Sequence, residues 1–261
     1  MRIDTHCHLE KKDYPNLDEI INHMGNNIMI VSADNLDSSY EVDELTKKYD
    51  NIYGTIGIHP SELKDFNEES IIKLEKLLNN KKIVAIGEIG LDYYYESDTK
   101  EKQKEVFIKQ IELANKHDLP IVIHSREALE DTIEILKRYP NIKADMHCYG
   151  YSLETANELI KINPNIKFGI GGVLTFKNSK KIKEVVKNLD MKYILLETDS
   201  PYLAPEPLRG TKNEPYNTKY IAEYISELKG IDYEEVERIT TLNAIGLFDL
   251  PINKWYYLYS L

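Results

Sequence analysis

Two histidines open the sequence in a spacing that suits metal binding. His6 and His8 lie two residues apart in DTHCHL, near the N-terminus. Side chains two residues apart on an extended strand point the same way, so this pair presents two imidazole nitrogens to one point. Neutral imidazole is a common metal ligand. Taken alone, the pair is more readily explained as two partly exposed histidines near a terminus, so the rest of the sequence must decide.

Further histidines and acidic residues occur where other strands are expected to end. These residues are His59 in GIHP, Glu88 in GEIGLD, His124 in PIVIHSR, His147 in MHCYG and Asp199 in ETDSP. Glu88 and Asp199 follow apolar segments, where a buried carboxylate without a partner is costly, so a cation partner is favoured. The other two histidines, His23 and His117, fall in or just after expected helices and are predicted to lie at the surface.

The candidate ligand set is too large for one catalytic ion. It comprises His6, His8, Glu88, His124, His147 and Asp199. Four imidazoles and two carboxylates exceed the needs of one tetrahedral ion with an open position. They predict two ions that share a carboxylate and a bridging water, as in sites for in-line phosphoryl hydrolysis. Mixed nitrogen and oxygen ligands admit Zn, Mn, Fe, Ni or Co, and suit Mg less well.

Eight apolar segments alternate with stretches of helical periodicity and must position these residues. The expected strands are 2–9, 28–34, 52–60, 83–92, 119–126, 143–150, 167–172 and 193–201. Eight strand–helix units in about 250 residues predict a (β/α)8 TIM-type barrel, with the site at the C-terminal ends of the strands. A doubly wound sheet is the alternative, but no G-x-G-x-x-G follows the first segment. No linker divides the chain, so residues 1–261 are predicted to form a single domain.

Helix boundaries are indicated by capping residues. Asp18, Ser152 and Asn217 precede expected helices. Residues 233–248 are interpreted as a further helix pair that closes the barrel. The sequence assigns no function to the aromatic C-terminal tail, residues 250–261.

Composition narrows the classes of function. The formal net charge of −11 argues against a protein that coats nucleic acid, but permits an enzyme that engages a few phosphates in a cleft. Cys7 and Cys148 make no disulfide framework and are expected as small buried residues behind the site. The sequence has no membrane-spanning run and no signal-peptide pattern. These features predict a cytoplasmic protein, with no obligate partner and a monomer as the default.

The motifs resemble those of the TatD family of metal-dependent deoxyribonucleases, over essentially the full length. The stretches that carry the resemblance are DTHCHL, GIHP, GEIGLDYY, PIVIHSR, MHCYG, and ETDSPYLAP followed by RGTKNEP. One departure is HCYGYS, where Gly150 directly follows Tyr149, so the loop after the sixth strand is altered by about one position.

The resemblance implies how the ligands are grouped. His6, His8 and Asp199 would hold one divalent ion, Glu88 would bridge, and His124 with His147 would hold the second. It also implies a nuclease with two divalent ions (Mg, Mn or Zn), often a 3′→5′ exonuclease on DNA ends or single strands.

Catalytic and substrate-binding roles follow as hypotheses. Asp199 would both ligate a metal and accept a proton from the attacking water. His59 would hydrogen-bond the scissile phosphate or leaving group, although it could merely cap the loop before Pro60. The candidate substrate contacts are Arg126, Arg209 and Lys212 for phosphates, and Tyr93 and Tyr94 for base stacking.

Two other classes of function stay open. The same activated water could cleave an aminoacyl ester on charged tRNA, an amide or a lactone, because a fold does not fix a function. A non-catalytic nucleic-acid-binding scaffold is the second alternative. The complete ligand set and the acidic charge both argue against it.

Overall fold

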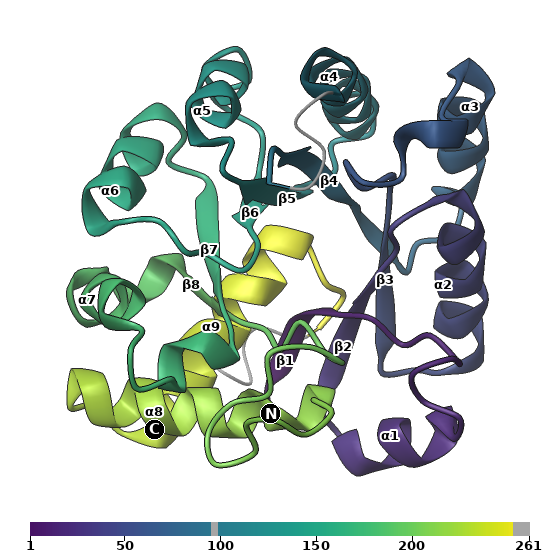
Figure 1. The fold of residues 1–261 in the computed structure, drawn as a ribbon. Coiled ribbons are helices and arrows are strands. Elements are labelled where there is room, and N and C mark those ends of the chain that lie inside the picture. The colour runs from purple at the N-terminus through teal and green to yellow at the C-terminus, as the bar shows by residue number, and fades with distance from the viewer. Residues whose placement is uncertain (95–98, 253–261) are drawn as a thin grey trace. The chain divides into compact units, whose positions relative to one another are not determined.

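The strands form one sheet whose order follows the chain. A computed structural model describes residues 1–94 and 99–252 (Figure 1). Its eight strands have the order β1-β2-β3-β4-β5-β6-β7-β8, and each is followed by a helix. They are β1 Ile3–Cys7, β2 Ile28–Ser32, β3 Ile52–Ile56, β4 Ile83–Asp92, β5 Ile121–Arg126, β6 Ala144–Met146, β7 Ile166–Ile170 and β8 Ile194–Leu196. This is the (β/α)8 TIM-type fold that the sequence predicts.

Nine α-helices are found in the part of the chain that the structure describes. They are α1 Leu17–Met24, α2 Leu36–Lys48, α3 Glu68–Leu77, α4 Lys100–Lys116, α5 Leu129–Lys137, α6 Leu153–Ile162, α7 Lys180–Asn188, α8 Thr218–Lys229 and α9 Tyr233–Phe248. Short 3-10 turns are η1 Leu63–Asp65, η3 Gly172–Thr175, η4 Met191–Tyr193 and η5 Pro215–Asn217. Within residues 1–94 and 99–252, none of the helices combines the length and apolarity that crossing a bilayer requires.

Several strands are shorter than predicted because the chain leaves the extended conformation before the site residues. After β6, Cys148 has φ +46°, and after β8, Asp199 has φ +54°. These left-handed backbone values are incompatible with a strand. His8, His59, His147 and Asp199 lie just beyond strand ends rather than within strands.

The helix-boundary predictions meet mixed outcomes. The hydroxyl of Ser152 accepts a hydrogen bond from the Thr155 amide at 3.3 Å, so the predicted cap of α6 is confirmed. Asp18 is not a cap, because α1 begins one residue earlier and Asp18 lies in its first turn. Asn217 precedes α8, but its side-chain amide donates to Asn213 Oδ1 instead of capping the helix.

The C-terminal prediction was wrong in one respect. Residues 233–248 form the single helix α9 rather than a helix pair, since no glycine or proline interrupts the segment before Gly246. Most of the tail, 253–261, lies outside the described residues.

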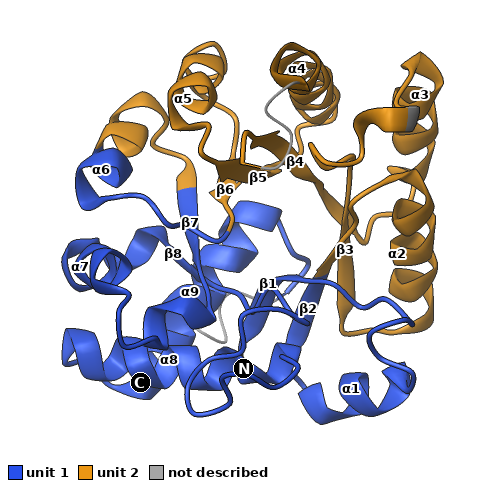
Figure 2. Cartoon of the chain, viewed as in Figure 1, with its two compact units in different colours: residues 1–30, 148–157, 167–261 blue, residues 31–147, 158–166 orange. Residues whose placement is uncertain are grey.

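The chain divides into two compact units (Figure 2). In the described part of the chain, unit 1 comprises residues 1–30, 148–157 and 167–252, and unit 2 comprises 31–94, 99–147 and 158–166. That residues 1–261 form a single domain stays a prediction.

Unit 2 is built on parallel pairing of β3 through β6. The register pairs Gly54 with Ile83, Gly90 with His124 and Ile123 with Met146. The strands are almost wholly buried, which explains their continuous apolar character. Phe107 of α4 packs in this core and is 1 % exposed.

Unit 1 combines the parallel pair β7–β8 with β1 and helices α7, α8 and α9. Phe168 pairs with Ile194, and both side chains are fully buried. The side-chain amide of Asn243 in α9 donates to the Met191 and Ile194 carbonyls at 2.7 and 2.8 Å, which ties this helix to the start of β8.

Candidate metal centres

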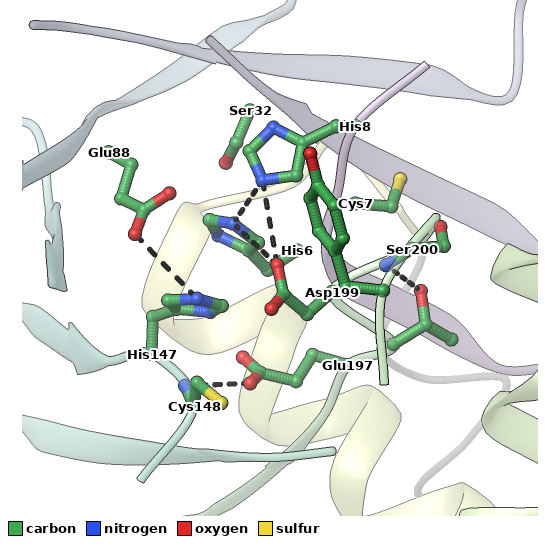
Figure 3. A network of polar contacts seen from close by, with 12 residues as sticks. His6, Cys7, His8, Ser32, Glu88, His147, Cys148, Glu197, Asp199 and Ser200 are labelled. Atoms are coloured by element: carbon green, nitrogen blue, oxygen red, sulfur yellow. Dashed lines mark hydrogen bonds and ion pairs between the residues drawn. The ribbon is translucent and has the colours of Figure 1, made fainter. Parts of the chain in front are cut away.

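Unit 1 brings together the three residues that the resemblance assigned to one ion. His6 lies in β1, His8 just after it, and Asp199 three residues after β8. The Nε2 atoms of His6 and His8 are 3.1 Å apart (Figure 3). Asp199 Oδ1 lies 3.5 Å from His8 Nε2 and 3.8 Å from His6 Nε2. This group is called the His6 cluster below.

Backbone hydrogen bonds place the His6 cluster. The Asp199 amide donates to the His6 carbonyl at 2.9 Å, and the His8 amide donates to the Ser200 carbonyl at 2.8 Å. A β-bridge joins Cys7 to Ser200. The segment after β8 is therefore paired with the end of β1, and the thiol of Cys7, which is buried as expected, faces the Ile30 carbonyl instead of the cluster.

Asp4 supports the His6 cluster, and sequence reasoning did not identify it. Its fully buried carboxylate accepts hydrogen bonds from the His6 amide at 3.3 Å, the Thr198 amide at 2.9 Å and the Thr198 hydroxyl at 2.6 Å. Burial raises the pKa of Asp4 well above its usual value, although these hydrogen bonds oppose the shift. The signal in the sequence was an acidic residue within the expected strand 2–9, two positions before His6.

Glu197 is a second residue that sequence reasoning missed. Its fully buried carboxylate accepts a hydrogen bond from the Cys148 amide at 2.7 Å. A Cβ at position 169 would lie 2.0 Å from Glu197 Oε2, so Gly169 leaves the space that this carboxylate occupies. Glu197 therefore anchors the loop after β6 within unit 1. Cys148 itself is half-buried, so the expectation of a buried thiol holds only for Cys7.

Unit 2 gathers three histidines around Glu88 of β4. Glu88 Oε1 lies 2.8 Å from His124 Nδ1, 3.6 Å from His59 Nε2 and 3.7 Å from His147 Nε2. The rings of His59 and His124 meet edge to face, with centroids 4.4 Å apart. His124 lies in β5, and His59 and His147 follow β3 and β6. This group is called the Glu88 cluster, and it includes His59, which the sequence had not assigned to metal binding.

Asp92 at the end of β4 contacts the other side of His124. Its Oδ2 lies 3.1 Å from His124 Nε2, and its side chain is buried. Burial lowers the pKa of His124, but the hydrogen bonds with Asp92 and Glu88 outweigh burial and raise that pKa to about 9. No role was assigned to Asp92 from the sequence, where it follows Leu91 in the motif GEIGLDYY.

Both clusters have the donor chemistry and spacing of a divalent metal site. With bonds of about 2.1 Å, ligands at neighbouring corners of a tetrahedron are about 3.4 Å apart. The donor atoms of the His6 cluster are 3.1, 3.5 and 3.8 Å apart. Those of His59, Glu88 and His124 all lie within 4.8 Å of one another. Imidazole and carboxylate together favour Zn, Mn, Fe, Ni or Co.

Gly90 allows the close approach of β4 and β5 beside the Glu88 cluster. Its φ is +144°, and a Cβ there would lie 2.0 Å from the His124 carbonyl oxygen. We expect Gly90→Ala to lower the free energy of unfolding by about 2–4 kcal/mol, because both the backbone conformation and the contact are lost. Urea denaturation followed by circular dichroism measures this.

Gly246→Ala is the matched control for that substitution. Gly246 lies in α9 with nothing within 4 Å of the position of a Cβ. Alanine there should stabilise the protein by up to about 1 kcal/mol. If Gly90→Ala unfolds at the wild-type urea concentration, the close approach is not as described.

The predicted substrate contacts lie at the end of β5, in the turn after β4 and in the segment after β8. The Arg126 guanidinium stacks 4.1 Å from the centre of the exposed Tyr94 ring, whereas the Tyr93 hydroxyl donates to Asp131 at 2.5 Å. In unit 1, Arg209 stacks on Phe176 at 4.3 Å. The Lys212 ammonium donates to the Asp13 carbonyl. Tyr95, which directly follows Tyr94 in the sequence, lies outside the described residues.

The surface histidines agree with prediction. His23 contacts Glu214 at 3.0 Å, and His117 at the end of α4 contacts Glu75 at 2.7 Å. Neither belongs to a candidate metal group found among the described residues.

A (β/α)8 fold with histidine–carboxylate clusters at and just beyond its strand ends defines the class of metal-dependent hydrolases. A sequence model of the TatD related DNase family matches residues 3–249, and the chain belongs to that family.

Individual relatives agree with this assignment. The chain is 44 % identical to the metal-dependent hydrolase YabD of Bacillus subtilis, over 95 % of this chain and 99 % of that protein. It is 32 % identical to the metal-dependent hydrolase YcfH of Escherichia coli K12, over 97 % of each. The crystal structure of YjjV, a TatD homologue from Escherichia coli K12, superposes with a TM-score of 0.87 at 28 % identity, covering 96 % of this chain and 98 % of that one. The protein is a metal-dependent hydrolase of the TatD family.

Proposed function

We propose that the protein hydrolyses phosphodiester bonds of DNA as a 3′→5′ exodeoxyribonuclease that uses two divalent metal ions. The observation that carries the proposal is that each unit contains a cluster combining imidazole nitrogens with a carboxylate. One ion, which is Mg, Mn or Zn, belongs to the His6 cluster, and a second belongs to the Glu88 cluster. Glu88 would supply a carboxylate oxygen to the ion of its own cluster. The family match to TatD related DNases supports DNA as the substrate.

When bound, the ions supply a water with a lowered pKa and stabilise negative charge on the phosphate oxygens. Asp199 accepts the proton of the attacking water. Its side chain is 17 % exposed, whereas those of His6 and His8 are 0 % and 8 % exposed, so Asp199 is the member of this cluster most open to solvent. A carboxylate in this position is an effective general base if it lies within hydrogen-bond reach of the water.

His59 is proposed to donate a hydrogen bond to the scissile phosphate or to the leaving group. Its Nδ1 is bonded to the Ser61 hydroxyl at 2.7 Å, which orients the ring, and its Nε2 points toward Glu88. Arg126, Arg209 and Lys212 are proposed to contact phosphates away from the scissile bond. The acidic net charge makes such local cations necessary for an anionic substrate.

Tyr94 is the better placed of the two tyrosines proposed to stack on a base. It is 53 % exposed, while Tyr93 is half-buried and engaged by Asp131. Stacking contributes about 1–3 kcal/mol per base, so Tyr94→Ala should raise KM for single-stranded DNA about tenfold and leave kcat unchanged. Steady-state kinetics on a short oligonucleotide measure both constants.

Tyr40→Ala is the control for Tyr94→Ala, because Tyr40 in α2 is also an exposed tyrosine of unit 2. It should have wild-type KM. Unchanged DNA affinity and unchanged terminal-nucleotide preference in Tyr94→Ala would rule out base stacking.

The test of the function is digestion of single-stranded DNA with a defined 3′ end, in the presence of Mg²⁺, Mn²⁺ or Zn²⁺. Chelated protein and Asp199→Asn are the controls. Release of mononucleotides from the 3′ end, lost in both controls, supports the proposal. If the protein binds two ions yet cleaves no DNA with any metal, the substrate contains another bond. Charged tRNA is then the substrate to test, and the expected product is a freed amino acid with the RNA intact.

Cytoplasmic location and a monomeric state stay predictions.

A further inference from the structure

The His124 ring lies between two buried carboxylates of the same strand. Its Nδ1 is 2.8 Å from Glu88 Oε1, and its Nε2 is 3.1 Å from Asp92 Oδ2. Gly90, midway between these acidic residues on β4, is the register partner of His124 on β5. Glu88 and Asp92 therefore contact opposite nitrogens of one imidazole.

Asp92 is held in place by groups other than His124. Its backbone amide donates to Gln103 Oε1 at 2.8 Å, and its carbonyl accepts from Gln103 Nε2 at 2.9 Å. Gln103 is a fully buried side chain of α4. The Asp92 Oδ1 atom accepts a hydrogen bond from the Tyr94 amide at 2.9 Å. The two bonds with Gln103 fix the backbone of Asp92, and the bond from Tyr94 holds the Oδ1 atom of its carboxylate, while Oδ2 lies beside the histidine.

An imidazole binds a metal only through a nitrogen that carries no proton. A fixed carboxylate beside one ring nitrogen favours a proton on that nitrogen, because the N–H then donates to it. The same contact orients the ring and increases the basicity of the other nitrogen. In this protein the carboxylate of Asp92 faces Nε2, so the nitrogen left for a metal is Nδ1, on the side of Glu88.

We propose that Asp92 is a positioning residue that keeps the His124 proton on Nε2 and so makes Nδ1 the metal-binding atom of the Glu88 cluster. This inference rests on the proposed metal-dependent function. Partners of this kind, one step removed from the metal, typically change metal affinity 10–100-fold when they are lost. Asp92 thus controls metal affinity at one cluster without touching substrate or metal.

The first experiment is titration of metal-stripped protein with Co²⁺, followed by absorption spectroscopy. Wild-type protein should bind two ions. The ion that His124→Ala no longer binds is the one that depends on this histidine. Asp92→Ala should lower the affinity of the protein for that ion 10–100-fold and leave its affinity for the other ion unchanged. Asp92→Asn keeps an oxygen acceptor but removes the charge, so its loss should be smaller. Asp43→Asn removes another buried carboxylate of unit 2, bonded to Lys47 and Asn80, and should match wild type.

The second experiment distinguishes positioning from a general loss of structure. Long-range ¹H–¹⁵N spectra of the zinc-saturated protein report which nitrogen of each histidine is protonated. In wild type and Asp43→Asn, His124 should carry its proton on Nε2. In Asp92→Ala a second population with the proton on Nδ1 should appear, while the other histidines keep their wild-type signals.

The outcomes separate this inference from the proposed function. If wild type binds no ion that depends on His124, the proposed metal centre fails and the role of Asp92 fails with it. If wild type binds that ion and Asp92→Ala binds it equally well with the same His124 tautomer, only the role of Asp92 is overturned.

Discussion

Asp199→Asn should lower metal-dependent hydrolysis by about 10³-fold and remove one of two bound ions. Asparagine keeps the shape of the side chain but loses the charge that faces the His6 and His8 nitrogens at 3.8 and 3.5 Å. It also cannot accept the proton of the attacking water. The metal ion stabilises developing charge in the transition state by several kcal/mol, and losing this stabilisation lowers the rate by about three powers of ten. The measurements are kcat on the oligonucleotide and metal content by mass spectrometry of the purified protein.

Asp190→Asn controls for the removal of an aspartate from the same unit. Asp190 is an exposed residue that accepts a hydrogen bond from the Lys192 amide and pairs with the Lys192 ammonium. Its replacement should leave kcat and metal content unchanged, with at most about 1 kcal/mol lost from folding as a turn cap. An Asp199→Asn protein that holds two ions and retains wild-type kcat would remove Asp199 from the mechanism.

Glu88→Gln should abolish metal binding at the Glu88 cluster and lower hydrolysis by about 10³-fold. Glu88 Oε1 is the atom that His124, His59 and His147 have in common, at 2.8, 3.6 and 3.7 Å. Without this charge, His124 and His147 would have to hold a divalent ion with no anionic partner. The expected loss again corresponds to about 4 kcal/mol of transition-state stabilisation. Calorimetric titration with Zn²⁺ and single-turnover kinetics measure the two effects separately.

Glu75→Gln is the matched control, because Glu75 also pairs with a histidine. Its Oε1 lies 2.7 Å from His117 Nε2, on the helical surface of unit 2. A glutamate–histidine contact at that place should be dispensable for metal binding and for rate. Equal metal binding by Glu88→Gln and Glu75→Gln would show that the Glu88 cluster is not a metal site.

The sequence determined the element types because hydrophobic period is local information. Runs such as IVAIGEIGLD are apolar apart from Glu88 and Asp92, which is typical of a strand covered on both faces, and β4 occupies this stretch from Ile83 to Asp92. Strand ends were less accurate, since they depend on residues such as Cys148 and Asp199 that adopt left-handed backbone angles no periodicity reports. The interruption expected within residues 233–248 was wrong for a local reason, because no glycine or proline breaks the segment before Gly246.

The sequence by itself also determined which residue types could hold a metal. His6 and His8 are expected to face one way because the side-chain period of a strand is two, and Glu88 and Asp199 stand out because they follow apolar segments. The tertiary structure decided what surrounds them. It placed His59 beside Glu88 and joined Asp4 to Thr198 across 194 residues of sequence. It also put Asp92 against the second nitrogen of His124. Such contacts arise from the register between neighbouring strands and from backbone turns beyond their ends, and neither is encoded in the spacing of residues along the chain.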